Sequence, residues 1–126
     1  MLDKIEHVGI RVEDLERSIS FYTDILGLPL VRRESNPDSG LKIGFIKVGE
    51  SELELLQFAD ADRPPSEGVF AHLAFTVEDL DDVVARLRDR DVERISDAPR
   101  EVFGGQARVF FFKGPDDETL ELWENQ

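Results

Sequence analysis

The sequence predicts an α+β fold built from two tandem βαβββ modules. The first observation is an internal repeat, because HVGIRVEDL at residues 7–15 returns as HLAFTVEDL at residues 72–80 with five of nine positions identical. The second is a shared closing phrase, LELL at residues 53–56 and LELW at residues 120–123. Self-similarity at a fixed offset is the signature of a duplicated supersecondary unit. The chain is therefore expected to be one domain, 1–126, made of module 1 (1–60) and module 2 (69–126).

The first half has the pattern of a strand, a helix and three strands. Residues 5–12 alternate between apolar and polar or small side chains, as in a half-buried strand. Asp14 is a typical helix N-cap, apolar residues follow at helical spacing over 15–26, and Gly27 is a natural helix end. Turn residues then separate three stretches that are expected to be strands, at 30–34, 41–48 and 52–58.

The second half repeats this order. We expect a strand over 70–77, a helix capped by Asp79, a less clear stretch over 92–102, and a strand pair at 108–113 and 119–123. The turn GPDD at residues 114–117 joins that pair and leaves Asp117 in a conformation that Asp tolerates better than most residues. Residues 59–68 are rich in Pro and Asp, which predicts a polar linker between the modules.

Composition narrows the possible functions. With 15 basic and 28 acidic residues the net charge is 15 − 28 = −13, which disfavours binding to nucleic acid or to anionic membranes. The chain has no Cys, so disulfides, thiolate metal sites and Cys nucleophiles are excluded. No apolar run is long enough for a membrane span, and the first residues lack the pattern of a secretory signal. A soluble cytoplasmic protein is expected.

The duplicated residues include a set that can bind a metal ion. The chain has only two His, and His7 and His72 open the two repeats at equivalent positions. Glu54 and Glu121 are equivalent in the two closing phrases. A single His or Glu in a strand is more often structural, but both recur in register while their neighbours diverge. Two imidazoles and two carboxylates suit a divalent cation and leave about two octahedral positions for water or substrate.

These residues resemble the vicinal oxygen chelate superfamily, which includes glyoxalase I, over essentially the whole chain. The matching phrases are HVGI at 7–10, EDL at 13–15, SFY at 20–22, ILG at 25–27, HLAF at 72–75 and LEL at 120–122. The resemblance implies a cup-like eight-stranded mixed sheet around one divalent metal, with His7, Glu54, His72 and Glu121 as ligands. It also implies an isomerase or lyase that moves a proton through a metal-bound enediolate. By the same analogy Glu121 is the general base and Glu54 is its counterpart.

The resemblance leaves the substrate open. Arg11 lies on the same strand face as His7, at the position where glyoxalase I has an arginine that holds the glutathione carboxylate. The alternative interpretation is that Arg11 is an ordinary solvated residue of the strand. Phe58 replaces the Asn with which glyoxalase I commonly contacts glutathione, and residues 68–71 lack a basic residue found in some glyoxalases. The stretch ELLQ at 54–57 is similar to methylmalonyl-CoA epimerases. The expected partner is thus a small molecule, either a thiol conjugate or a thioester.

Other activities on the same scaffold are less well matched. Metal-free ligand-sequestering proteins like the bleomycin-resistance members commonly lack the full ligand set. Extradiol dioxygenases and fosfomycin-resistance transferases use two His and one carboxylate, so Glu54 would be surplus. Nitrogen and oxygen donors accept Ni, Co, Zn, Mn or Fe, so the metal is not identified. Family members are commonly dimers, and a homodimer is expected here.

Three aromatic features remain. The run Phe110–Phe112 is expected to be buried strand packing. The phrase FGG at 103–105 is either a lip over a cavity or a simple turn. Trp123 is two residues from Glu121 and so shares its strand face, where it either lines a pocket or packs at the end of the sheet.

Overall fold

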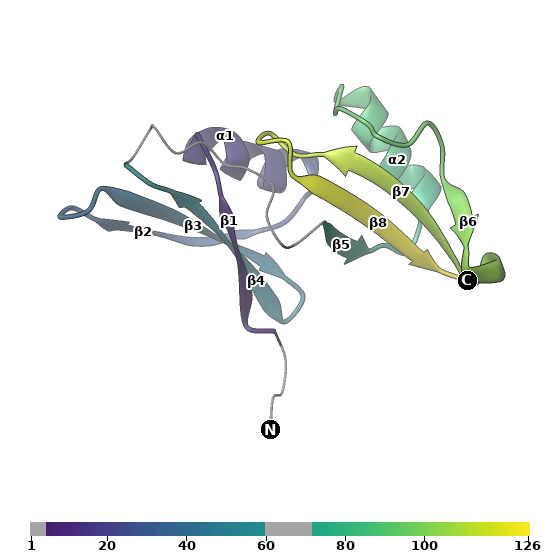
Figure 1. Ribbon diagram of the computed structural model, residues 1–126, viewed down its shortest axis with the longest axis horizontal. Helices are drawn as coiled ribbons and strands as arrows, with labels where there is room; N and C mark the ends of the chain where they lie inside the picture. The colour runs from purple at the N-terminus through teal and green to yellow at the C-terminus, as the bar shows by residue number, and fades with distance from the viewer. Residues whose placement is uncertain (1–4, 60–71) are drawn as a thin grey trace. The chain divides into compact units, whose positions relative to one another are not determined.

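The computed structural model describes residues 5–59 and 72–126, and the chain divides into two units, Met1–Ser66 and Glu67–Gln126. Each unit contains one four-stranded sheet and one α-helix (Figure 1). The predicted α+β class and the two βαβββ modules are confirmed, and the eight expected strands form two sheets of four. The linker predicted at 59–68 lies almost wholly outside the described residues, as do Phe70 and Ala71 of the strand predicted over 70–77.

The elements of the first unit are β1 (His7–Arg11), α1 (Leu15–Ser20), the π-helix η1 (Phe21–Ile25), β2 (Leu30–Asn36), β3 (Leu41–Val48) and β4 (Ser51–Gln57). In its sheet, of order β1-β4-β3-β2, β1 runs parallel to β4, and β4, β3 and β2 are antiparallel neighbours.

The elements of the second unit are β5 (Leu73–Thr76), α2 (Leu80–Asp89), β6 (Arg100–Val102), the 3-10 turn η2 (Phe103–Gly105), β7 (Ala107–Lys113) and β8 (Thr119–Asn125). Its sheet repeats the topology of the first, in the order β5-β8-β7-β6.

Both helices begin where the sequence predicts. The Asp14 carboxylate accepts the backbone N–H of Arg17 at 3.1 Å, and the Asp79 carboxylate accepts that of Asp82 at 3.1 Å. The strand that is last along the chain in each unit adds a second cap. The Gln57 side chain accepts the N–H of Leu15 in unit 1, and the Glu124 side chain accepts that of Leu80 in unit 2, each at 2.7 Å. These acceptors satisfy N–H groups that have no partner inside the helix, and they tie each helix start to its own sheet.

The first helix departs from the regular α-helix expected over 15–26. From Phe21 onward the backbone forms a π-turn, with the N–H of Leu26 bonded to the carbonyl of Phe21 at 3.1 Å. The hydroxyl of Thr23 donates to the carbonyl of Ile19, four residues earlier in the same segment, at 2.7 Å. The segment still ends at Gly27, whose φ of 74° suits a residue without a Cβ.

The core of each unit lies on one face of its sheet. In unit 1, α1 contacts β3 and β4, and the side chains of Leu15 and Ile19 approach Gly44 of β3. In unit 2, Leu80, Val84 and Leu87 of α2 are buried over β7 and β8, which run side by side beneath the helix in Figure 1. Each such side chain contributes about 1.5–3 kcal/mol when fully buried. The α-helix of each unit thus covers one face of its sheet, and Glu54 and Glu121 lie on the opposite faces.

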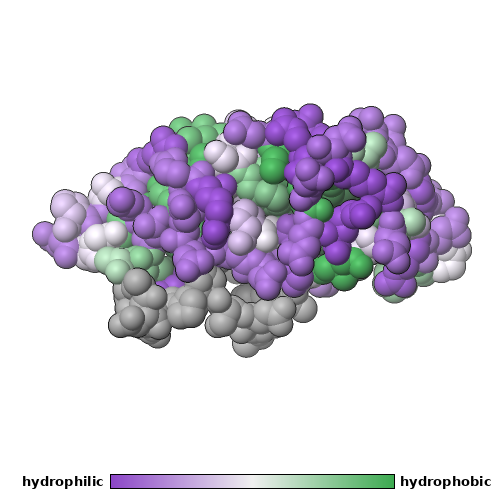
Figure 2. Space-filling model, turned by 90° about the horizontal axis from the view of Figure 1, so that it is seen from above, coloured by the Kyte–Doolittle hydropathy of each residue, from purple (hydrophilic) through white to green (hydrophobic). Residues whose placement is uncertain are grey.

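The surface agrees with the high content of charged residues, 34% of the chain. On the side shown in Figure 2, hydrophilic residues cover most of the surface, and apolar residues appear only in small patches. Within the described ranges, neither helix is long and apolar enough to cross a membrane.

Candidate functional site: two equivalent His–Glu pairs

The first pair joins β1 to β4. Glu54 is paired with Gly9 in the parallel register, so its side chain lies on the face that also carries His7 and Arg11, opposite to α1. His7 Nε2 is 2.7 Å from a carboxylate oxygen of Glu54. The Glu54 side chain is 17% exposed and that of His7 is 48% exposed. The pair therefore has one sheltered carboxylate and one imidazole open to a ligand.

The second pair repeats this arrangement in unit 2. Glu121 is paired with Ala74 of β5, two residues after His72, just as Glu54 is paired with Gly9, two residues after His7. His72 Nε2 is 3.3 Å from a carboxylate oxygen of Glu121, which is 7% exposed as a residue. The repeat seen in the sequence is thus a repeat of register and of side-chain contact.

The donor chemistry of each pair fits a divalent cation. Imidazole nitrogen and carboxylate oxygen are donors that Ni, Co, Zn, Mn and Fe accept, and each pair places one of each within 3.3 Å of the other. Across residues 5–59 and 72–126, no group of three or more His, Cys, Asp or Glu side chains lies close enough to hold a metal ion. The structure brings the four predicted ligands together as two pairs, and their meeting around one ion stays a prediction.

Arg11 lies on the same face as His7 but already has a partner. Its guanidinium carbon lies 4.6 Å from the centroid of the Phe58 ring. Phe58 is one residue beyond β4 and is 42% exposed. A stacked guanidinium keeps its N–H groups free to bind a carboxylate through its edge. Phe58, which stands where glyoxalase I commonly has an Asn, is therefore the residue that contacts Arg11, the candidate substrate-binding residue.

A second arginine on this face was missed in the sequence. Arg32 of β2 is paired with Phe45, which is paired in turn with Glu54, so all three share the face of the His7–Glu54 pair. Its guanidinium carbon lies 3.8 Å from the Phe45 ring centroid, and its Nε is 3.6 Å from Glu34. Strand alternation alone does not reveal this neighbour, because it depends on the register of three strands.

Aromatic side chains occupy the corresponding face in unit 2. Phe110 and Phe112 are fully buried, but Phe111 is only half-buried and is paired with Glu121. Its ring meets that of His72 edge to face at 5.7 Å. The prediction that the whole Phe110–Phe112 run is buried packing is thus wrong for Phe111, because successive side chains of a strand point to opposite faces.

The pKa shifts belong to a structural contact on the helix side of unit 2. A hydrogen bond of 2.9 Å from Arg108 to Asp81 lowers the pKa of the Asp81 carboxyl and raises that of the Arg108 guanidinium. Arg108 also donates to Glu124 at 3.3 Å, the residue that caps α2. This contact fixes the start of α2 over the sheet and takes no part in the His–Glu pairs.

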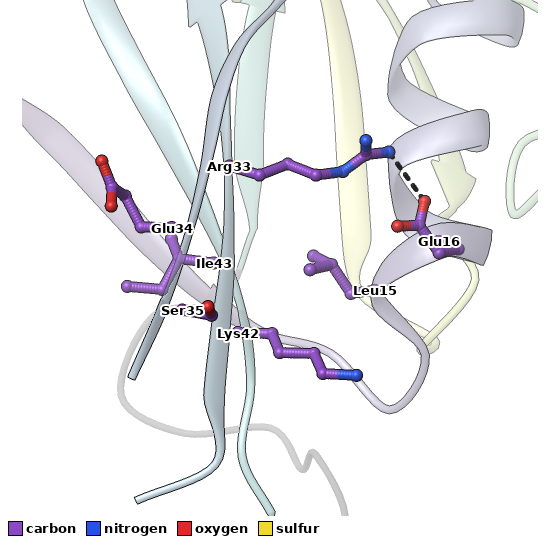
Figure 3. Close-up of a pocket in the computed structure, with 7 residues that line it drawn as sticks. All are labelled: Leu15, Glu16, Arg33, Glu34, Ser35, Lys42 and Ile43. Atoms are coloured by element: carbon purple, nitrogen blue, oxygen red, sulfur yellow. Dashed lines mark hydrogen bonds and ion pairs between the residues drawn. The ribbon is translucent and has the colours of Figure 1, made fainter. Parts of the chain in front are cut away.

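A shallow cavity of about 410 Å³ lies between α1 and strands β2 and β3. Figure 3 shows Arg33 reaching across it to Glu16 of α1, with a contact of 2.8 Å. The other lining residues are Leu15, Glu34, Ser35, Lys42 and Ile43. Its lining contains neither member of the His7–Glu54 pair, so this cavity is not the candidate active site.

Comparison with known proteins identifies the family to which the chain is similar. Residues 4–122 match the profile of the Glyoxalase/Bleomycin resistance protein/Dioxygenase superfamily. The lactoylglutathione lyase of Salmonella typhimurium is 30% identical over 125 residues, which cover 96% of this chain and 92% of that protein. The mitochondrial methylmalonyl-CoA epimerase of Mus musculus is 27% identical, over 92% of this chain and 68% of that protein. The trypanothione-dependent glyoxalase I of Leishmania major superposes with a TM-score of 0.80 at 30% identity, covering 98% of this chain and 87% of that one.

Proposed function

Because the chain belongs to the Glyoxalase/Bleomycin resistance protein/Dioxygenase superfamily, we propose that it is a divalent-metal-dependent isomerase or lyase of the glyoxalase I type. The observation that carries the proposal is the duplicated His–Glu pair, which has the same register and the same side-chain contact in both units. The substrate is a small molecule, the hemithioacetal of a 2-oxoaldehyde with a thiol, and the product is the thioester of a 2-hydroxy acid. The reaction moves one proton between adjacent carbons and needs no oxidant or reductant.

The proposed ligands are His7, Glu54, His72 and Glu121, which together would hold one divalent ion. Two neutral imidazoles and two carboxylates balance its charge, and Ni, Co, Zn, Mn and Fe are all compatible with these donors. When bound, the ion polarises a substrate carbonyl and makes the neighbouring C–H group more acidic.

Glu121 is the proposed general base. Its carboxylate is nearly buried, beside the His72 imidazole and opposite Phe111 in the sheet register, so it is held in one place and largely shielded from water. It takes the proton from the thiol-bearing carbon and returns it to the adjacent carbon. Glu54 is the equivalent residue in unit 1, and its side chain is more exposed than that of Glu121. The two carboxylates therefore have the same chemistry in different environments, which favours different roles.

Arg11 is the proposed anchor for a substrate carboxylate. A planar guanidinium binds a carboxylate through two parallel hydrogen bonds, and stacking on Phe58 holds its plane. Phe58 itself offers no hydrogen bond, unlike an Asn, so part of a glutathione contact is absent. The thiol is therefore the least defined part of the substrate.

A second candidate is an epimerase of the methylmalonyl-CoA type. The similarity to the mouse enzyme over 92% of the chain favours it, as does the ELLQ stretch at 54–57. Removal and return of a proton next to a thioester carbonyl needs the same pair of carboxylates. A metal-free binding protein would instead have no use for the four donors, and it would purify without metal.

Turnover tests the proposal directly. The metal-loaded protein is assayed with methylglyoxal hemithioacetals of glutathione, 2-mercaptoethanol and coenzyme A, and with a methylmalonyl thioester. Matched variants are Glu121→Gln and Glu54→Gln, which keep side-chain size and remove the charge. Loss of the general base should lower kcat about 10²- to 10⁴-fold in Glu121→Gln. Turnover of none of these substrates, or undiminished kcat in Glu121→Gln, would overturn the assignment. Light scattering tests the proposed homodimer, and fractionation of the source cells tests the proposed cytoplasmic location.

A further inference from the structure

We propose that the cavity between α1 and strands β2 and β3 binds a small aliphatic dicarboxylate, with one carboxylate on Lys42 and the other on Arg33. Both residues line the cavity. Its volume of about 410 Å³ lies within the range of small-molecule sites, about 300–1,000 Å³. The cavity is on the α1 side of the sheet of unit 1, opposite to the face of the His7–Glu54 pair. A ligand bound there therefore does not occupy the proposed active site.

The register of β2 and β3 places two cations on the face under α1. Arg33 is paired with Gly44, the residue that Leu15 and Ile19 of α1 approach. Lys42 is two residues before Gly44 in β3, so its side chain leaves the sheet on the same face. Figure 3 shows both side chains extending toward α1, on either side of Leu15. The two positive charges thus border one cavity from two neighbouring strands.

The cavity has more positive than negative charge among the side chains that face it. Glu16 of α1 faces it and accepts from Nη2 of Arg33 at 2.8 Å, whereas Glu34 points to the other side of the sheet in Figure 3. The Lys42 ammonium makes no hydrogen bond or ion pair with any residue of 5–59 or 72–126. In a chain with a net charge of −13, such a local excess of positive charge favours an anionic ligand.

The spacing of the two cations favours a ligand with two carboxylates. Diagonal neighbours of an antiparallel pair, such as Arg33 and Lys42, are about 7–8 Å apart. Their side chains do not converge in Figure 3, because Leu15 lies between them. Ser35 is directly opposite Lys42 in the register and adds a hydroxyl donor at that end. Two carboxylates joined by a short methylene chain can therefore contact both cations, with the methylene groups over Leu15.

Glu16 competes with the ligand for Arg33. The side chains of this ion pair are 51% exposed for Arg33 and 70% exposed for Glu16, and ion pairs this exposed contribute little to stability. The guanidinium also has further N–H donors beside the one that is bonded to Glu16. A ligand carboxylate can thus share the guanidinium with Glu16 or replace it at small cost. Removal of the Glu16 charge should consequently strengthen binding.

A residue-resolved NMR titration tests the site in the full-length protein. The ¹⁵N-labelled protein, loaded with Zn²⁺, is titrated with glutarate at constant ionic strength. The amide signals of residues 33–35 and 42–44 should shift and saturate. Butyrate, with a single carboxylate, and malonate, whose carboxylates are too close together to reach both cations, should bind about two- to fivefold more weakly. Equal binding of glutarate and butyrate, or shifts confined to residues 7–11 and 52–57, would overturn the proposal.

Three variants, each changing one charge, separate this site from general attraction of anions. Lys42→Met should weaken glutarate binding about two- to fivefold, the range for one exposed ion pair, and Glu16→Gln should strengthen it by a similar factor. Lys47→Met is the matched control, because it removes a cation from the opposite face of β3, and it should leave Kd unchanged. Loss of structure cannot produce two effects of opposite sign. The same change in Kd for Lys42→Met and Lys47→Met, or an unchanged Kd in Glu16→Gln, would contradict the assignment.

Discussion

Gly44 is predicted to be a position where one methyl group destabilises unit 1. A Cβ built there lies 3.0 Å from Cδ1 and 3.1 Å from Cγ1 of Ile19, and 3.3 Å from Cδ1 of Leu15. Both neighbours are about 95% buried, at 5% and 4% exposed, so they have little space to move into. Overpacking of this kind costs about 1–3 kcal/mol, partly offset by about 0.4–1 kcal/mol from the lower entropy of the unfolded chain. We expect Gly44→Ala to lower the free energy of unfolding by about 1–2 kcal/mol.

A double-mutant cycle tests the stated cause. Ile19→Val removes the methyl group closest to the new Cβ and alone costs about 0.5–1.5 kcal/mol. Ile19→Val removes the methyl group that the new Cβ would contact, so the two changes are not independent. The destabilisation of the double variant should therefore be smaller than the sum of the two single destabilisations by at least about 0.5 kcal/mol. Urea unfolding followed by far-UV circular dichroism gives these energies, and Trp123 fluorescence follows unit 2 separately. Additivity of the two changes, or a gain in stability from Gly44→Ala, would refute the packing argument.

Three further predictions concern separate contacts. Asp81→Asn should lower the free energy of unfolding at neutral pH, because it removes the carboxylate that accepts from Arg108. Since Arg108 lowers the pKa of Asp81, the stabilisation by this carboxylate is present above the ordinary pKa of Asp and disappears as the pH falls through the lowered value. The variant and the wild type should therefore be equally stable in acid. The difference in urea midpoint between wild type and variant, measured against pH, shows it, and a difference that grows in acid would contradict the sign. Asp14→Ala should cost about 0.5–2 kcal/mol by removing the cap of α1, and Asp14→Asn should restore most of it in the same assay. Phe58→Asn should raise kcat/KM for glutathione over 2-mercaptoethanol about two- to tenfold by adding a hydrogen-bonding side chain beside Arg11, and an unchanged ratio would argue against Arg11 as the anchor.

Local signals in the sequence were sufficient for most of the fold. The strand expected over 41–48 is β3 itself, and both helices begin after the predicted Asp caps. Asp117 has a φ of 66°, the strained turn position that the sequence assigned to it. These features depend on a few neighbouring residues, so they can be read without knowing the tertiary structure.

Features that depend on strand register were not predictable in the same way. The π-turn at Phe21 arises in a stretch whose apolar spacing is that of a regular helix. Strand β6 has only three residues and lies in the stretch 92–102, where the alternation of apolar and polar side chains is unclear, yet it pairs with β7. The stacking of Arg32 on Phe45 joins side chains from two strands that the sequence places well apart. The Arg32–Phe45 contact and the β6–β7 pairing depend on strand register, which alternation along one strand does not fix, whereas the π-turn is a local departure that apolar spacing does not reveal.

The candidate site was predictable to the level of pairs. Duplication in the sequence selected two His and two Glu, and the structure places each His against its own Glu. Whether the two pairs share one ion depends on how the two units are assembled, which a sequence repeat does not specify.

Metal stoichiometry tests the central claim most directly, namely that both pairs hold the same ion. The wild-type protein and the matched variants His7→Ala and His72→Ala are loaded with Mn²⁺, and bound metal per chain is measured at equilibrium. One shared site predicts one ion per chain in the wild type and a large loss of affinity in both variants. Two ions per chain, with each variant losing one and keeping the other, would show two separate sites and contradict the account.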